Sequence, residues 1–267
     1  MRMLLHTVRG HFTPATLRVY LAAQALFFWG VIFVCWRRFP VENAFSILTH
    51  TFSYLGSFEP DRNPPGWWLF CIAMVFWGLS SVPVVRYITH QVALASGKPL
   101  RGPARLLTTG CAGVILVGLF PDARGPILGP IRWTDLHYLG ALFVVIGFVF
   151  GVPWFAARLF RAARSANTPE PARAAFRRAR LPQLLFIAET TVALTCLIRW
   201  EFIYRDRRAQ AEAAGRIIGS SWTEAMNTPY SFPLWDNLFV YTLFVYLAWT
   251  ALALATNGPI ADASNRE

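Results

Sequence analysis

The fold of this chain is decided by a short polar stretch that separates two long apolar runs. Residues 118–140 read GLFPDARGPILGPIRWTDLHYLG, with the prolines and most of the charges near the middle. Residues 106–121 before it and 136–157 after it contain no Asp, Glu, Lys or Arg. A helix needs about 20 apolar residues to cross about 30 Å of hydrocarbon. The stretch is therefore predicted to be a tight loop between two membrane-spanning helices.

Composition extends this interpretation to the whole chain. Hydrophobic residues make up 55% of the 267 residues and charged residues only 15%, whereas ordinary soluble domains are about 45–50% apolar and about 25% charged. Further uncharged runs cover residues 19–36, 63–85 and 237–261, and the run over 181–198 contains one charge, Glu189. We therefore predict an all-α polytopic membrane protein whose six transmembrane helices form a single domain over residues 1–267.

The basic residues predict how the spans are oriented. The net charge is +11, and the densest group of arginines lies between the fourth and fifth runs: Arg158, Arg161, Arg164, Arg173, Arg177, Arg178 and Arg180. Loops rich in Lys and Arg stay in the cytoplasm, which places both termini there and the protein in the cell membrane. Because orientation explains this charge, we expect no nucleic acid partner. The connections 38–66, 122–135 and 200–235 then face outward.

Polar side chains gather at this outer face. Asp122 ends the third run and His137 begins the fourth, so both are expected at one level beside the bilayer. In the first outer connection Glu42, Ser46, His50 and Ser53 recur at helical spacing, which predicts an amphipathic helix. Two alternatives stay open: its polar face only meets water, or Ser53 and His50 face Asp122 and His137.

Three kinds of site could use this rim. In a hydrolase, Ser53 or Ser46 would be the nucleophile, His137 or His50 its base, and Asp122 or Asp135 the orienting acid. In a metal site His50, His137 and Asp122 would bind zinc with water in the fourth position, but no pair of histidines has the spacing of a metal motif, so neither metal nor cofactor is expected. In a structural rim the same groups would hydrogen-bond the loop backbone.

Two arginines and one glutamate complete the candidate residues. Arg124 and Arg132 lie in the second outer loop, where they could bind a headgroup phosphate or be ordinary loop arginines. Glu189 lies about midway along the fifth run, where an ionisable side chain is costly and is by default a functional candidate. It would serve proton-coupled transport, or stay protonated and hydrogen-bonded within the bundle.

Several short motifs resemble a known family. They are Ser53-Tyr-Leu-Gly56 followed by Pro60, then Val117-Gly-Leu-Phe-Pro-Asp122, then His137 before Gly140-Ala141. In this order they resemble a group of six-span prokaryotic membrane proteins of unknown function, which is distantly similar to damage-regulated autophagy modulators and to proteins that remodel the lipid of GPI anchors. The resemblance implies six helices and a lipid ligand, and it emphasises Ser53, Gly56, Pro121, Asp122 and His137. The long loop after the fifth span departs from the family pattern.

The sequence therefore predicts an integral membrane protein that binds or processes a lipid at a polar rim on its outer face. The alternatives are a transporter or structural membrane protein without catalytic activity, and a metal-dependent membrane hydrolase. A remoter similarity to membrane hydrolases that use serine, aspartate and histidines is weakened because this chain lacks their paired histidines on a late span. Membrane lipids are the expected partners, and the sequence makes no prediction of oligomeric state.

Overall fold

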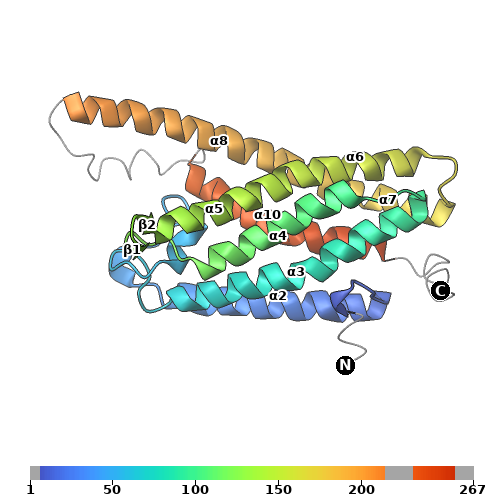
Figure 1. Cartoon of the computed structure of the whole chain (residues 1–267), viewed down its shortest axis with the longest axis horizontal. Coiled ribbons are helices and arrows are strands. Elements are labelled where there is room, and N and C mark those ends of the chain that lie inside the picture. Colours follow the sequence, from blue (N-terminus) through green and yellow to red (C-terminus); the bar gives the residue numbers. More distant parts are fainter. Residues whose placement is uncertain (1–6, 214–230, 256–267) are drawn as a thin grey trace.

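A computed structural model describes residues 7–213 and 231–255 and confirms the all-α fold (Figure 1). Six helical stretches are long and apolar enough to cross a membrane. They are α2 (Pro14–Arg37), α3 (Trp67–Ser96), α4 (Arg101–Leu119), the continuous α5 (Trp133–Val145), η3 (Ile146–Phe150) and α6 (Gly151–Arg164), then α7 (Glu170–Arg178) with α8 (Arg180–Ala213), and α10 (Phe232–Leu254). The chain is thus a multi-pass membrane protein.

Local sequence signals fix several helix ends. The side chain of Thr13 accepts from Thr16 N before α2, and Thr16 bonds back to the backbone of Thr13, which satisfies amides that have no partner in the helix. At the start of α10 the side chain of Ser231 accepts from Leu234 N. At its C-terminus α3 stops at Gly97, whose φ of 64° is left-handed and therefore suits glycine.

The predicted amphipathic helix in the first outer loop is wrong. The segment instead contains two short 3-10 helices, η1 (Val41–Asn43) and η2 (Phe52–Gly56). Between them Ala44 has a left-handed φ of 45°, and Ser46 N donates to His50 Nδ1 at 3.2 Å. Such local side-chain bonds compete with the backbone hydrogen bonds of a helix. The segment is therefore not an α-helix, although its polar and apolar residues recur at helical intervals.

The helices α3, α4 and α5 pack with their backbones in near contact. A Cβ added at Gly147 would lie 2.1 Å from Gly110 N, one added at Gly113 would lie 2.5 Å from Val144 N, and one added at Gly118 would lie 2.8 Å from Val75 N. Small residues let membrane helices approach closely. The π-helical turn η3 lies at the contact between Gly110 and Gly147.

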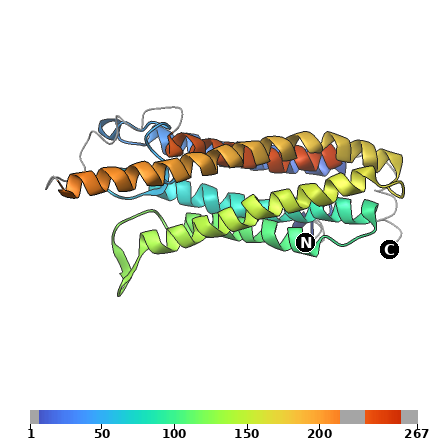
Figure 2. The ribbon, with the colours of Figure 1, turned by 90° about the horizontal axis from the view of Figure 1, so that it is seen from above.

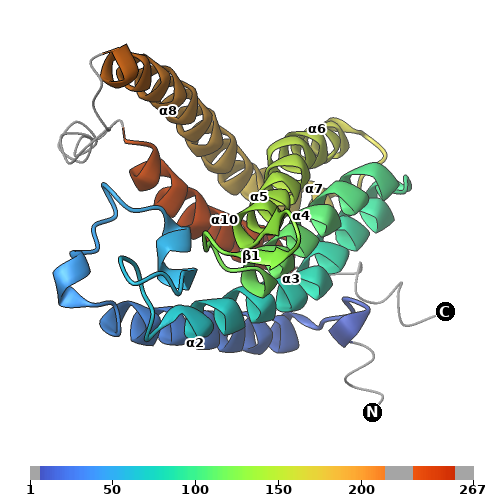
Figure 3. The same cartoon turned by 60° about the vertical axis from the view of Figure 1, so that its left-hand side comes forward.

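The spans run roughly along the long axis of the bundle (Figures 1 and 2). One of them, α8, is less closely packed than the others at one end. The first loop and the short hairpin of β1 (Pro126–Leu128) and β2 (Ile131–Arg132) share one end of the bundle. We call this the outer end, following the orientation predicted from the arginines. There α8 diverges from α5, although it packs on α6 nearer the other end (Figure 3).

Candidate functional site

A cavity of about 670 Å³ occupies the outer half of the bundle. Its apolar walls come from α3, α4, α5, α8 and α10, and include Met74, Val114, Leu142, Leu194 and Val240. The first outer loop covers its outer end through residues 51–54. Cavities of about 300–1,000 Å³ with apolar walls and a few polar groups are typical of ligand sites.

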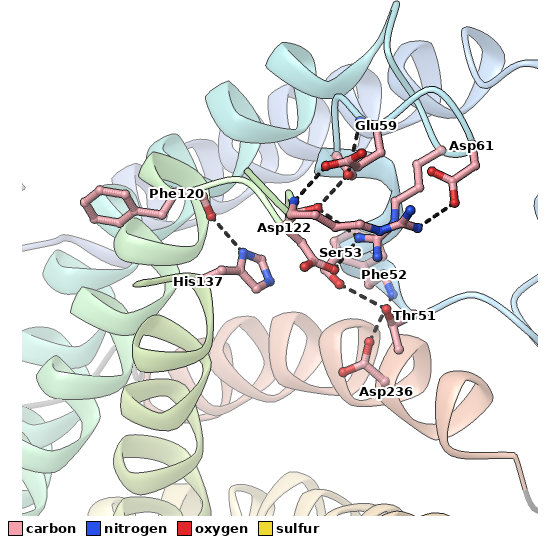
Figure 4. Close-up of polar contacts among 12 residues, drawn as sticks. Thr51, Phe52, Ser53, Glu59, Asp61, Phe120, Asp122, His137 and Asp236 are labelled. Atoms are coloured by element: carbon pink, nitrogen blue, oxygen red, sulfur yellow. Dashed lines mark hydrogen bonds and ion pairs between the residues drawn. The ribbon is translucent and has the colours of Figure 1, made fainter. Parts of the chain in front are cut away.

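The polar groups of the cavity are concentrated at its outer end (Figure 4). Ser53 comes from η2, Arg62 from the loop after it, Asp122 from the loop after α4, His137 from α5 and Asp236 from the first turn of α10. Three of these, Ser53, Asp122 and His137, are the side chains that the sequence singled out for chemistry. The structure thus brings them to one cavity, while the roles predicted for them stay predictions.

Arg62 and Asp122 form a buried ion pair that joins the two outer loops. Arg62 Nη1 donates to Asp122 Oδ2 at 2.6 Å and to its carbonyl oxygen at 2.9 Å, and the two side chains are only 11% and 7% exposed. Ser57 Oγ donates to the same carbonyl at 2.5 Å. The guanidinium also lies 4.2 Å from the centre of the Tyr54 ring. Charge-assisted bonds in a buried setting are strong and directional, so this pair fixes the roof of the cavity.

His137 is held in one orientation by a backbone carbonyl. Its Nδ1 lies 2.8 Å from the oxygen of Phe120, and the residue is 4% exposed. A carbonyl oxygen can only accept, so Nδ1 carries the proton. In the neutral ring Nε2 is then an acceptor available to the cavity that His137 lines.

The first turn of α10 binds the first outer loop. Asp236 Oδ2 accepts from Phe52 N at 3.0 Å, and Asn237 Nδ2 donates to the carbonyl of His50 at 2.9 Å. Both contacts connect segments more than 180 residues apart. The roof of the cavity is therefore anchored to the last span as well as to the loop after α4.

The geometry does not form the nucleophile and base of a serine hydrolase. Ser53 Oγ bonds Thr51 Oγ1 at 3.0 Å, and within residues 7–213 and 231–255 it has no hydrogen bond to an imidazole. His50 Nδ1 is bonded to Ser46 N and, at 2.9 Å, to Thr49 Oγ1. Burial lowers the pKa of His50 below its usual 6.5, and the charge of Arg62 acts in the same direction. His50 is thus neutral at pH 7 and committed to the fold of the loop.

The two arginines predicted to bind a phosphate lie away from the cavity lining. Arg124 Nη2 donates to Asp61 Oδ2 at 2.6 Å in a pair whose side chains are 63% and 57% exposed. Although partial burial would raise the pKa of the Asp61 carboxyl, the hydrogen bond and charge of Arg124 prevail and lower it. Arg132 is exposed in β2, and its backbone N donates to Asp135 at the start of α5. Neither arginine is among the cavity residues.

The three candidate metal ligands, His50, His137 and Asp122, do not form a metal site. Across the part of the chain that the structure describes, no three His, Cys, Asp or Glu side chains are placed to share a metal ion. His50 faces its own loop through Nδ1, and His137 faces Phe120 through Nδ1. The arrangement of the described residues therefore does not support the hypothesis of a metal-dependent hydrolase.

Glu189 lies inside the bundle on α8. Both of its carboxylate oxygens are buried, and neither has a hydrogen-bond partner among the described residues. One prediction was a protonated Glu189 that is hydrogen-bonded within the bundle. No such bond to a described side chain or backbone group is present. Glu189 does not line the cavity, whereas its neighbour Thr190 does.

Sequence reasoning missed two of the charged residues that line the cavity, Arg62 and Asp236. Each directly precedes an uncharged run, Arg62 the run over 63–85 and Asp236 the run over 237–261, and neither belongs to a motif. The signal that could have found Asp236 is its neighbour Asn237, because an Asp-Asn pair one turn inside a span is costly without partners. Arg62 carries no comparable local signal.

Comparison of the chain with family models, with curated proteins and with solved structures gave no match. The resemblance to the six-span family stays a prediction, and function has to be inferred from the geometry of the cavity.

Proposed function

We propose that this protein binds an amphipathic lipid of the cell membrane, with the tail inside the cavity and the polar end beside Arg62, Asp122 and His137. The observation that carries this proposal is the division of one cavity into a polar outer end and an apolar depth. Membrane lipids have the same division, so the tail would stay in an apolar environment while the headgroup meets the polar side chains.

The depth of the cavity supports a lipid as occupant. On the continuous α5 and η3 segment the lining extends from His137 to Val149, which is roughly 18 Å along a helix that rises 1.5 Å per residue. One leaflet contributes about half of the 30 Å hydrocarbon core. The cavity therefore reaches about as far as the acyl chains of one leaflet.

The open side of the cavity supports access from the membrane. Tyr138 and Leu142 on α5 line the cavity and are nevertheless 63% and 50% exposed. Leu194 and Leu197 line it from α8, the helix that diverges from α5 at this level (Figure 3). An apolar opening that faces the side of the bundle would admit a lipid without passage through water.

Filling the cavity is expected to weaken lipid binding. Leu194→Trp adds bulk to a cavity wall, so a lipid should bind at least about tenfold more weakly, the loss expected when about 1.4 kcal/mol of contact is removed. Native mass spectrometry of the purified protein, with phospholipid extract as the probe, measures the bound fraction.

The matched control is Ile198→Trp, one turn along the same helix. Ile198 is 57% exposed and does not line the cavity, so this variant should bind lipid like the wild type. Equal binding by wild type and both variants, with unchanged melting temperatures, would show that the bound lipid occupies the surface and would remove the proposal.

Glu189→Gln separates lipid binding from proton-coupled transport. Glutamine keeps the shape of the side chain and removes only the titrating proton, so binding in the cavity is expected to change less than about twofold, because Glu189 is not among the lining residues. The same binding measurement tests this. Complete loss of binding in a variant with an unchanged melting temperature would favour a site that works through Glu189.

A further inference from the structure

The charged side chains at the polar end of the cavity have an excess of negative charge. They are two carboxylates, Asp122 and Asp236, and one guanidinium, Arg62, whose Nη1 is bonded to Asp122 and whose Nε has no partner among the described residues. The remaining ring nitrogen of His137 is an acceptor in the neutral ring. A phosphate or carboxylate placed here would bring a third anion beside a single cation.

One of these acceptors is buried and has no partner. Asp122 Oδ1 makes no hydrogen bond to any residue in the described ranges, although the residue is only 5% exposed. Its other oxygen is held by Arg62 at 2.6 Å, so the carboxylate cannot turn to satisfy both oxygens. Buried polar atoms nearly always have partners, and a missing donor at the lining of a cavity indicates a donor on the ligand.

Asp236 is the second carboxylate at this end of the cavity. Its Oδ2 accepts from Phe52 N at 3.0 Å, and no other hydrogen bond of this carboxylate is found within the described part of the chain. The two carboxylates come from different elements, one from the loop after α4 and the other from α10 (Figure 4).

Resting on the proposed function, we infer that the lipid bound here has a headgroup with hydrogen-bond donors and no negative charge, either an ammonium or free hydroxyls. Such a headgroup would donate to Asp122 Oδ1 and to Asp236. An anionic phosphate would be excluded, because charges of one sign repel strongly in a site with few water molecules. The phosphate contact expected from Arg124 and Arg132 is then unnecessary, since both lie away from the lining.

Three probes with the same oleyl or oleoyl chain test this inference on the purified full-length protein. They are oleylamine, 1-oleoylglycerol and oleoyl lysophosphatidic acid, and native mass spectrometry gives their dissociation constants. We expect the amine and the glycerol to bind at least about tenfold more tightly than the phosphate, the effect of hydrogen bonds to a charged group. Tighter binding of the amine would identify an ammonium as the donor, and tighter binding of the glycerol would identify hydroxyls.

Asp236→Asn tests the charge directly. Asparagine can still accept from Phe52 N through its carbonyl oxygen, so the roof of the cavity should keep its anchor. The ratio of the dissociation constants of lysophosphatidic acid and oleylamine should fall by about tenfold. In the control Asp61→Asn the same charge is lost from an exposed carboxylate outside the cavity, and the ratio should stay as in the wild type.

The possible failures are distinct. If none of the three probes binds the wild-type protein, the proposed function fails and this inference fails with it. If all three bind with similar constants, or the phosphate binds most tightly, the cavity is a lipid site but its headgroup selection is not the one inferred. This reading of the wild type holds even if Asp236→Asn does not fold.

Discussion

Asp122→Ala is expected to lower the free energy of unfolding by about 3–5 kcal/mol, the cost of leaving a buried charge unpaired. The variant removes the carboxylate that pairs with Arg62, while the guanidinium stays 11% exposed beside Tyr54. The bonds of Arg62 and Ser57 to the backbone carbonyl of residue 122 remain, but they do not neutralise the charge of the guanidinium. Steric trapping in bicelles measures this free energy for a membrane protein at equilibrium.

Two controls give this expectation its meaning. Arg124→Ala breaks an ion pair between the same two loops, but one whose side chains are more than half exposed, so it should cost only about 0–1 kcal/mol. The double variant Arg62→Met with Asp122→Leu removes both charges and should recover most of the stability. A loss at Asp122→Ala no larger than at Arg124→Ala would contradict a structural role for the buried pair.

Gly147→Ala is expected to destabilise the bundle by about 3 kcal/mol or more, at or above the usual cost of overpacking. The new methyl group would lie 2.1 Å from Gly110 N and 2.3 Å from its Cα. Both are backbone atoms, so no side chain can rotate away, and α4 would have to move from η3. The same steric-trapping measurement applies.

Gly30→Ala is the matched control in a helix of the same protein. Apart from the local backbone of its own helix and its chain neighbours, nothing lies within 4 Å of a Cβ at Gly30, so this variant should be neutral or stabilise by up to about 1 kcal/mol, because alanine favours the helix. If both variants behaved alike, α4 and η3 would be less closely packed than the structure indicates.

The spans could be predicted from the sequence because their signal is local. Each depends on an uncharged run of about the length that the bilayer requires, and within the described residues each of the six runs contains a helix long enough to span a membrane. The first outer loop could not be predicted in this way. The spacing of Glu42, Ser46, His50 and Ser53 suits a helix, but the left-handed Ala44 and the bond from Ser46 N to His50 interrupt it.

The candidate site could be predicted only in part, for a related reason. Asp122 and His137 were expected at one level because each lies at the end of an apolar run, and both line the cavity. The partner of Asp122 is Arg62, which is 60 residues away in sequence. Their contact depends on the path of the first loop, which no periodicity describes. Asp236 reaches the same cavity only because α10 packs beside the loop.

The contacts between η2 and α10 have a consequence for the order in which the protein is made. Phe52 N and the carbonyl of His50 bind Asp236 and Asn237, which are synthesised more than 180 residues later. During translation the first loop thus emerges long before the residues that hold it in place. The cavity is completed only when the last span has been inserted, so a nascent chain stalled before α10 would have most of the helices and no closed site.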